Sequence, residues 1–297
     1  MGSHSTPVWL VTATTSGFGK QIALEALSRG HKVIATARDS SKLSLLKSKG
    51  AAVLDLDVTA DKSVLDATFK QAASIYGRIS HVVVAAGYIF VGAVEEAARE
   101  EVLDVFSTNV FGVLNVTRAA APYLREAAKD GSPAALVTFG SLGSYNSGPA
   151  IAHYCSTKGA VSQITEGLAE ELKPFGIDVC CVEPGYTRTE FLQTVDGKER
   201  RVVAKGQMDI YKDGPAGELK GAMDAVNGKQ PGDVEKAGRV IVDVLMKEGV
   251  AKGREIPVRL PLGSDTLQVM RARIEQYEQR IREWGDIARL VDYESEF

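Results

Sequence analysis

Cysteine and histidine are scarce in this chain, with three and four residues among 297. Cys180 and Cys181 are adjacent in an apolar run and Cys155 stands alone, so the sequence offers no disulfide framework and suits a reducing compartment. The histidines are too scattered for a metal site, and we expect no bound metal. His31 and His81 precede expected strands, and we expect both at the surface.

A long apolar run and a large excess of one charge are also absent. The longest apolar stretch, near residues 82–94, is shorter than the roughly 20 residues of a membrane span. The net charge of -3 gives no electrostatic footprint for nucleic acid. The N-terminus lacks the pattern of a signal peptide, and the last four residues match no organelle address. We therefore expect a cytoplasmic protein whose partner is a small molecule.

Short apolar runs alternate with amphipathic stretches, which favours a parallel sheet covered by helices. The runs are rich in Val, Ile and Leu rather than alternating, as in strands buried on both faces. The predicted fold is α/β, a single domain over residues 1–297 with a doubly wound parallel sheet of about seven strands (Rossmann-type) and helices on both faces. The expected strands are residues 8–12, 32–36, 51–56, 81–85, 134–139, 177–182 and 256–260, and the expected helices are residues 19–28, 41–48, 61–75, 99–129, 152–174, 233–247 and 266–290.

Two segments fall outside this rhythm. Residues 186–231 carry several glycines and mixed charge, and they are too long for an ordinary connection. Because long excursions at the carboxyl end of a parallel sheet cover ligand crevices, we predict a substrate lid there, with a flexible surface insertion as the alternative. Residues 261–297 are a predicted helical extension whose apolar stripe is better explained as a packing face than as a cofactor site. The stripe consists of Ile274, Tyr277, Ile281 and Trp284.

A glycine-containing turn follows the first expected strand and opens the first helix. Such a turn points backbone N–H groups and the positive end of a helix dipole at whatever lies above it. Gly17 and Gly19 permit the backbone to approach a pyrophosphate closely. The pattern alone also fits a tight turn, but its strand–turn–helix context favours a dinucleotide site. Its sequence is Thr12-Ala13-Thr14-Thr15-Ser16-Gly17-Phe18-Gly19.

The second expected strand ends at Ala37-Arg38, where dehydrogenases selective for NAD carry an acidic residue. An arginine suits the 2′-phosphate of NADP, because a guanidinium pairs with phosphate through two hydrogen bonds. We therefore predict NADP(H) in preference to NAD(H), with a solvated arginine as the alternative. Asp57 and Val58 follow the third strand, where the carboxylate could accept from the adenine amino group or cap the next helix.

Tyr154 and Lys158 lie four residues apart in an expected helix, so their side chains share one face. An ammonium beside a phenol lowers the pKa of the phenol from about 10 toward neutrality. A tyrosine of that kind can pass a proton to or from a substrate oxygen. Ser141 lies thirteen residues upstream, and His153 either faces the substrate or lies on the helix surface.

Taken in order, these residues resemble the motifs of the short-chain dehydrogenase/reductase family over about residues 8–191, and more loosely over residues 233–260. Five motifs in the family's order make this resemblance far more specific than any one of them. They are the glycine turn at residues 12–19, the helix asparagine at Asn109, the active-site serine at Ser141, the Tyr-x-x-x-Lys motif at Tyr154 and Lys158, and the Pro-Gly-x-x-x-Thr motif at Pro184, Gly185 and Thr189.

The chain departs from the family pattern at two places. Ala13 stands where the turn has its first glycine, and Val84 and Ala85 stand where the family has two asparagines before Ala86 and Gly87. Those asparagines resemble structural braces, so their loss bears on local rigidity and cofactor affinity rather than on the chemistry. The turn and the second strand are most similar to the steroid/retinol-type and fungal ketoreductase branches.

The resemblance implies a role for each catalytic residue. Tyr154 is the general acid in carbonyl reduction and the base in alcohol oxidation, and Ser141 orients the carbonyl. Lys158 lowers the pKa of Tyr154 and holds the nicotinamide ribose, while Asn109 anchors a water that connects Lys158 to solvent. The implied cofactor contacts are Thr12, Thr14, Ser16, Gly17, Phe18, Gly19, Arg38, Asp57, Val58, Ala86, Gly87, Asn109, Tyr154, Lys158, Pro184, Gly185, Thr187 and Thr189.

Three of these assignments have plainer alternatives. Asn109 could only brace the sheet, and Lys158 could be a solvated helix lysine. Ser141 could be an ordinary loop serine, since Ser144 and Ser147 stand close by in the sequence.

The expected function is that of an NADP-dependent oxidoreductase, which moves a hydride between nicotinamide and a ketone/secondary-alcohol pair in the direction of reduction. The alternatives are a non-catalytic dinucleotide-sensing scaffold and a non-redox isomerase or cyclase on the same fold. The family parallel also implies a homodimer or homotetramer through helices near residues 109–129 and 152–174. We expect an apolar substrate pocket, lined by Phe90, Val91, Tyr186, Phe191 and Leu192.

Overall fold

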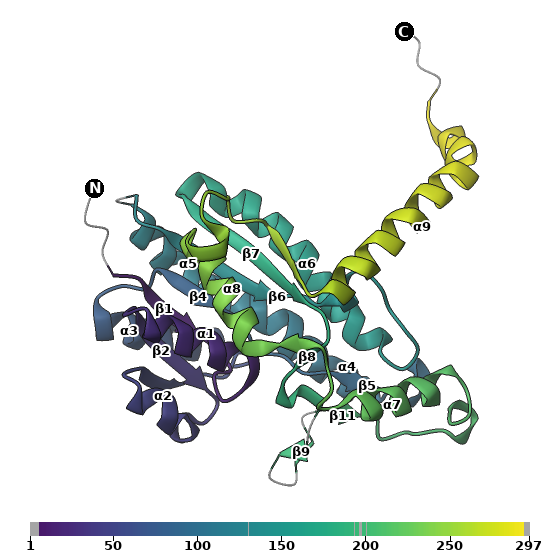
Figure 1. Cartoon of the computed structure of the whole chain (residues 1–297), viewed down its shortest axis with the longest axis horizontal. Helices are drawn as coiled ribbons and strands as arrows, with labels where there is room; N and C mark the ends of the chain where they lie inside the picture. Colours follow the sequence, from purple (N-terminus) through teal and green to yellow (C-terminus); the bar gives the residue numbers. More distant parts are fainter. Residues whose placement is uncertain (1–5, 130, 193, 196–197, 200, 294–297) are drawn as a thin grey trace.

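The computed structural model describes residues 6–129, 131–192, 194–195, 198–199 and 201–293. Its largest sheet has seven strands, all paired in parallel, in the order β3-β2-β1-β4-β6-β7-β13 (Figure 1). The expected doubly wound parallel α/β fold is therefore confirmed. The strands are β1 (Val8–Val11), β2 (Lys32–Ala37), β3 (Ala52–Asp55), β4 (His81–Val83), β6 (Ala134–Phe139), β7 (Ile177–Pro184) and β13 (Arg259–Leu262).

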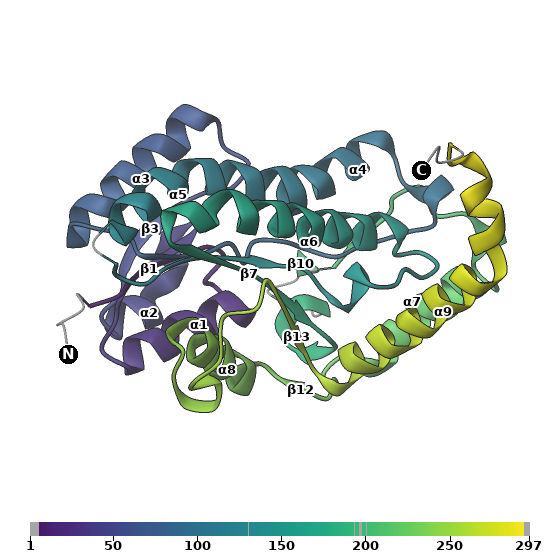
Figure 2. The same ribbon diagram turned by 90° about the horizontal axis from the view of Figure 1, so that it is seen from above.

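Helices cover both faces of this sheet (Figure 2). Successive residues of a strand point to opposite faces, and the adjacent residues Trp9 and Leu10 are both fully buried, each in a different apolar core. This explains why the strand segments are apolar without alternation. One face carries α1 (Gly17–Ser28), α2 (Ser44–Ser48) and α8 (Val234–Met246), and the other carries α3 (Lys62–Tyr76), α4 (Arg99–Phe106), α5 (Gly112–Ala128) and α6 (Ala152–Leu172).

The helix expected over residues 99–129 is not one regular helix. A five-residue π-helical segment, Ser107–Phe111, separates α4 from α5. Within it, the Asn109 side chain accepts a hydrogen bond from the Tyr88 N–H (3.0 Å) and donates one to the Tyr88 carbonyl (2.9 Å). Short π-helical segments inside α-helices are frequent at functional sites, and here the segment carries the family's asparagine.

Residues 186–231, predicted as a lid, contain short elements of their own. β8 (Thr187–Arg188) pairs with β12 (Gly232–Asp233), and β11 (Val202–Val203) pairs with β5 (Phe90–Val91), so this segment is attached to the body at two points. Its role as a lid stays a prediction. Its other regular elements are β9 (Thr194–Val195), β10 (Lys198–Glu199) and α7 (Pro215–Val226).

The C-terminal part of the chain ends in a long helix. β13 begins three residues later than expected, at Arg259. After β13, α9 (Ser264–Ala288) runs away from the rest of the molecule (Figure 1). No helix in the described ranges, α9 included, combines the length and the apolar character needed to cross a membrane.

His81 is buried, so its expected position at the surface was wrong. It begins β4, which lies between β1 and β6, and its ring stacks on Trp9 with centroids 4.4 Å apart. One ring nitrogen, Nδ1, lies 2.9 Å from the Ser80 hydroxyl. Burial lowers the pKa of His81 to about 3. His31 is half-buried, and its Nδ1 accepts a hydrogen bond from the Trp9 indole at 3.1 Å.

This buried histidine should make the protein less stable in acid. Between the ordinary pKa of 6.5 and the folded value of about 3, the unfolded chain binds one more proton, so stability falls as the pH falls. From pH 6.5 to pH 4.5 we expect the wild type to lose about 2 kcal/mol more unfolding free energy than His81→Phe. Urea denaturation at each pH measures this. Equal losses in the two proteins would refute the assignment. His31→Phe should remove a smaller part of the acid sensitivity, because burial lowers the pKa of the half-buried His31 as well.

Candidate active site

A crevice of about 790 Å³ opens at the carboxyl ends of the parallel strands, lined by residues that follow β1, β2, β4, β6 and β7. The strand order reverses at β1, and doubly wound sheets bind their ligands outside such a point. The volume suits a small-molecule site. Most of the expected site residues line it, namely Thr12, Ser16, Gly17, Phe18, Gly19, Arg38, Asp57, Val58, Ala86, Gly87, Ser141, Tyr154, Lys158, Pro184, Gly185, Thr187 and Thr189.

The turn between β1 and α1 fits a diphosphate. Gly17 has a φ of +57°, and a Cβ on Gly19 would lie 2.7 Å from the Thr12 carbonyl oxygen, so both positions favour glycine. Ser16 is the N-cap of α1, but within the described residues its side chain accepts no hydrogen bond from a backbone N–H at the start of the helix. The N–H groups at the start of α1 are therefore left for an anion in the crevice, as in other dinucleotide sites.

Ala13 keeps the glycine-like shape of this turn. Its φ is +54°, a left-handed conformation that costs a residue with a side chain roughly 1 kcal/mol. The next residue, Thr14, donates to the Thr36 carbonyl through both its N–H (3.0 Å) and its hydroxyl (3.1 Å). Thr14 thus ties the turn to β2 and does not line the crevice, contrary to the expected cofactor contact.

Two side chains brace the loop in which the family's asparagines are missing. The Thr12 hydroxyl accepts hydrogen bonds from the N–H groups of Ala85 (2.9 Å) and Ala86 (3.2 Å). Asn109 holds Tyr88 on the other side and also donates to the Thr157 hydroxyl at 3.1 Å. Asn109 does not border the crevice, and its side chain braces this loop; its expected role in anchoring a water beside Lys158 stays a prediction.

Cations line the crevice where the adenosine ribose is expected. Arg38 and Lys42 are exposed and border the crevice together with Asp39, whose carboxylate lies 3.8 Å from the Lys42 ammonium; Lys42 was not among the residues expected from the sequence. The nearby carboxylates are engaged by their own loops. Asp39 accepts from the N–H (3.1 Å) and hydroxyl (2.5 Å) of Ser41, and Asp57 accepts from the N–H (2.9 Å) and hydroxyl (2.7 Å) of the residue two positions later. Asp57 therefore closes a turn rather than capping α3.

Tyr154, Ser141 and Lys158 meet at the opposite end of the crevice. Tyr154 and Lys158 lie one turn apart on α6, and Ser141 follows β6 and is hydrogen-bonded to the Tyr154 hydroxyl. The Lys158 Nζ lies 5.8 Å from the centroid of the Tyr154 ring. All three residues are buried in the fold and border the crevice, so a substrate oxygen placed beside the tyrosine would be shielded from water.

The pKa of Tyr154 does not shift in the direction expected from the sequence. Burial raises it above the ordinary value of 10.0, and the hydrogen bond with Ser141 lowers it only in part. The Lys158 ammonium donates to the Phe139 carbonyl at 2.8 Å rather than to the phenol. Burial also lowers the pKa of Lys158 to about 8. Tyr154 therefore carries its proton at neutral pH, as a general acid must.

The two rival serines have other roles. The Ser144 hydroxyl accepts from the Ser141 N–H (3.1 Å) and donates to the Lys158 carbonyl (3.0 Å), and Ser144 does not border the crevice. Ser147 borders the crevice but is bonded to the Cys155 thiol. Ser141 is thus the serine that reaches Tyr154.

The apolar part of the crevice differs from the expected set. Tyr186, Phe191 and Leu192 line it, but Phe90 and Val91 do not, because their strand β5 is covered by β11. The sequence analysis missed four apolar residues that take their place. Leu219 and Met223 come from α7. Their spacing of four residues within the predicted lid is the sequence pattern that could have indicated them. The four are Ile89, Ile151, Leu219 and Met223.

His153 has neither of the two roles considered. It is half-buried with its ring packed edge-on against Phe90, centroids 5.8 Å apart, and it does not border the crevice. Within the described ranges no group of His, Cys, Asp or Glu is arranged to hold a metal ion.

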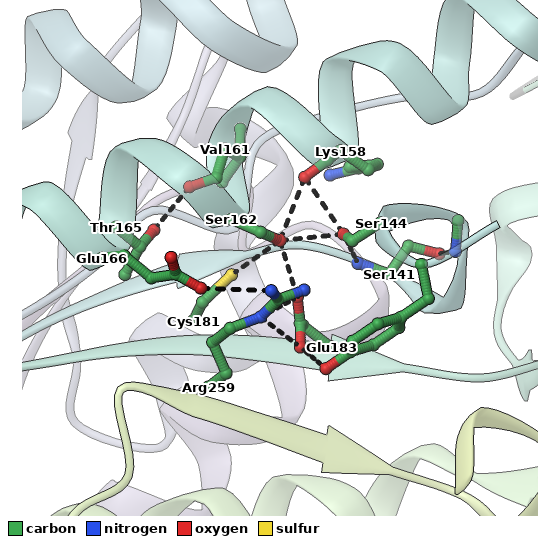
Figure 3. Close-up of polar contacts among 12 residues, drawn as sticks. Ser141, Ser144, Lys158, Val161, Ser162, Thr165, Glu166, Cys181, Glu183 and Arg259 are labelled. Carbon is green, nitrogen blue, oxygen red and sulfur yellow. Dashed lines mark hydrogen bonds and ion pairs between the residues drawn. The ribbon is translucent and has the colours of Figure 1, made fainter. Parts of the chain in front are cut away.

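A buried ionic network lies directly behind the catalytic residues (Figure 3). The Glu183 carboxylate is fully buried at the end of β7, where it accepts from the Ser162 hydroxyl (2.6 Å), the Tyr145 hydroxyl and the Arg259 guanidinium (2.6 Å). The Ser162 hydroxyl lies 2.9 Å from that of Ser144. The network therefore links β13, through Arg259, to the serine that holds the backbone of Ser141 and Lys158.

Comparisons with known proteins agree with this geometry. The family model for short chain dehydrogenase matches residues 7–200. "Oxidoreductase calM" of Penicillium decumbens is 32% identical over 97% of this chain and 94% of its own length. The 3-ketodihydrosphingosine reductase of Bacteroides thetaiotaomicron is 35% identical over 69% of this chain and 71% of its own length.

A solved structure extends the agreement to the whole fold. The short-chain dehydrogenase from Streptomyces avermitilis is 34% identical, with a TM-score of 0.83 over 97% of this chain and all of that one. A family model that covers most of the chain, relatives at this identity and the crevice with its Tyr154–Lys158 pair all agree. The chain belongs to the short-chain dehydrogenase family of oxidoreductases.

Proposed function

We propose that the protein is an NADP-dependent carbonyl reductase that converts a ketone to a secondary alcohol. The observation that carries the proposal is that one crevice joins an end bordered by Arg38, which is free to meet a phosphate beside the Lys42–Asp39 pair, to a proton-donating end with Tyr154 and Ser141. A bound nicotinamide supplies the hydride. The turn at the start of α1 lies between the two ends, and its free N–H groups suit the diphosphate of the cofactor.

The residues of the chain supply the proton and the orientation. Tyr154 holds its proton at neutral pH and passes it to the carbonyl oxygen as that oxygen gains negative charge. The Ser141 hydroxyl, already bonded to Tyr154, orients the same oxygen and stabilises the charge. The Lys158 ammonium lies close enough to stabilise the tyrosinate that forms. Thr187 and Thr189 border the crevice, where they would hold the carboxamide of a bound cofactor.

The substrate is proposed to be fairly apolar. Phe191, Leu192, Leu219 and Met223 border the crevice on the side of Tyr154, and the Phe191 ring centroid lies 6.1 Å from that of Tyr154. All four belong to residues 186–231, which supports a lid that closes over the substrate. The Bacteroides relative, by its name, reduces a ketone, which supports a carbonyl substrate here.

We also propose the homodimer or homotetramer that the family parallel implies, in the cytoplasm. Leu103 on α4 and Phe111 before α5 are about half exposed, which supports a contact with another copy at this face.

Arg38→Asp should reverse the choice of cofactor. The change removes a charge-assisted contact to the 2′-phosphate and puts a like charge in its place, so NADPH affinity should fall roughly 10- to 100-fold. NADH affinity should change little, because NADH lacks that phosphate. Fluorescence titration with both cofactors measures the effect. Lys47→Asp, an equal change of charge on the exposed face of α2 outside the crevice, is the control. Equal loss of NADH and NADPH would show that Arg38 does not select NADP.

The proposal as a whole is tested with a panel of ketones and reduced cofactor. Loss of reduced-nicotinamide absorbance with a ketone, and with NADPH faster than with NADH, is the expected result. Tight NADPH binding without oxidation by any ketone would instead favour a dinucleotide-sensing scaffold. Conversion of a substrate with no net consumption of cofactor would favour an isomerase or cyclase.

A further inference from the structure

α9 carries an apolar stripe that the described chain leaves mostly uncovered, although Met270 near its start is half-buried. Its members are separated by three and four residues in alternation, the spacing of the seam between two coiled helices. Five of its six side chains are between 48% and 68% exposed. The stripe consists of Leu267, Met270, Ile274, Tyr277, Ile281 and Trp284.

Only the beginning of α9 is held by the body of the molecule. The Asp265 carboxylate accepts from the Tyr186 N–H at 2.7 Å. Arg273 donates to the Tyr145 carbonyl (2.6 Å) and to the Asn146 side chain (3.0 Å). Beyond this point the helix projects away from the body (Figure 1). The apolar stripe therefore continues where its own chain offers it no packing surface.

An exposed stripe of this kind on a projecting helix indicates a partner. A single helix in water is only marginally stable, and most of the stability of a helix comes from packing of its apolar face. Contiguous apolar patches on a protein surface mark interaction sites. The partner is not an anionic membrane, because residues 264–291 contain five arginines and five acidic residues and so have no excess of positive charge.

We propose that α9 pairs in antiparallel orientation with α9 of a second copy of this chain. The register that uses all six stripe residues places Met270 opposite Ile281 of the partner subunit and Ile274 opposite Tyr277 of the partner subunit. In the same register Leu267 faces Trp284 of the partner subunit. The twofold axis then passes between residues 275 and 276, at the middle of α9, so the whole helix, about 37 Å long, is used.

Side-chain volume favours this orientation over a parallel one. Each aromatic residue meets an aliphatic one, whereas a parallel pair would stack Tyr277 on Tyr277 and Trp284 on Trp284. Beside the seam, Arg271 of one copy faces Glu278 of the other. Arg273 would face a like charge, Arg280, but its guanidinium is turned back toward Tyr145 of its own chain.

The pairing also brings two active sites into contact with the interface. The end of each helix, where Leu290 and Val291 are more than three-quarters exposed, reaches the start of the partner's α9. That start is bonded to Tyr186 and, through Arg273, to Asn146, and both of these residues border the crevice. The second copy thus lies beside the loops that surround the mouth of each crevice.

Cysteine cross-linking tests the register directly. Chains carrying Met270→Cys and chains carrying Ile281→Cys, with tags of different size, are co-expressed and treated with a mild oxidant. We expect a disulfide between the two kinds of chain and none within either sample alone. The native cysteines are buried and do not interfere. A parallel pair would instead link each variant to itself, and that result, or the absence of any link, overturns the proposal.

A matched pair of charged variants separates pairing from chance collision. Ile274→Glu in the cross-linking background should lower the yield at least roughly tenfold, because it places an unpaired carboxylate in the seam. Gln279→Glu adds the same charge on the opposite face of the helix and should leave the yield unchanged. Circular dichroism confirms that both variants are folded. Equal yields from the two variants would also overturn the proposal.

Discussion

Replacing Tyr154 with phenylalanine is expected to slow ketone reduction roughly 10²- to 10⁴-fold, the range for loss of a general acid. The substitution removes one hydroxyl and leaves the ring, whose contacts with Phe191 and the surrounding core stay in place. NADPH should therefore bind with nearly unchanged affinity. Steady-state kinetics on any ketone that the screen identifies, together with a fluorescence titration of NADPH, measure the two quantities separately.

The physical reason for so large a loss is the protonation state of Tyr154. Burial raises the pKa of Tyr154, so its phenol keeps its proton at neutral pH. The phenol borders the crevice beside Ser141, which would orient the carbonyl. Tyr186→Phe is the matched control, since Tyr186 borders the same crevice but is 41% exposed and is not bonded to Ser141. It should stay within a few-fold of the wild type. A Tyr154→Phe enzyme that keeps more than about a tenth of the wild-type rate would refute the acid role.

The fold could be predicted because its information is local. The strands are short apolar runs between amphipathic stretches, and that pattern depends on the burial of both sheet faces rather than on any distant contact. The errors occurred at the boundaries of elements. β13 begins three residues later than expected, and the side chain of Asn109, bonded to the backbone of Tyr88, accompanies a π-helical segment inside the long helix.

The parts of the site that could be predicted are those whose residues lie close together in the sequence. The turn at residues 12–19 and the Tyr154–Lys158 pair have their geometry built into one turn or one helix. The pKa direction of Tyr154 could not be predicted in the same way. It depends on how much of the ring is buried and on where the Lys158 ammonium points, and the Phe139 carbonyl that binds it comes from a different element.

Nothing in the sequence indicated the role of Glu183. It sits between a run of buried strand residues and the Pro-Gly motif, and nothing near it in sequence indicates a partner. Its partners come from elsewhere in the chain: Tyr145 after β6, Ser162 on α6 and Arg259 on β13. A carboxylate at the end of a buried strand is costly unless it is paired, so coordinates were needed to show why it is tolerated.

Glu183→Gln is expected to lower the free energy of unfolding by about 3 kcal/mol, the cost of breaking a buried ion pair from one side. The amide keeps the size of the side chain but leaves the Arg259 charge with only the partly exposed Glu166 as a partner. Because the network also positions Ser144 behind Ser141, the folded variant should lose kcat more than NADPH affinity. Urea denaturation at one fixed protein concentration and steady-state kinetics measure the two effects.

Glu166→Gln is the matched control for Glu183→Gln. It removes a carboxylate from the same arginine, but the Glu166 side chain is 44% exposed, so its loss should cost less than about 1 kcal/mol. If burial is what makes the Glu183 pair indispensable, the two variants must differ widely although both leave Arg259 with one partner. Similar unfolding midpoints would mean that water reaches Arg259 readily, and that the network behind Ser141 contributes little to holding it.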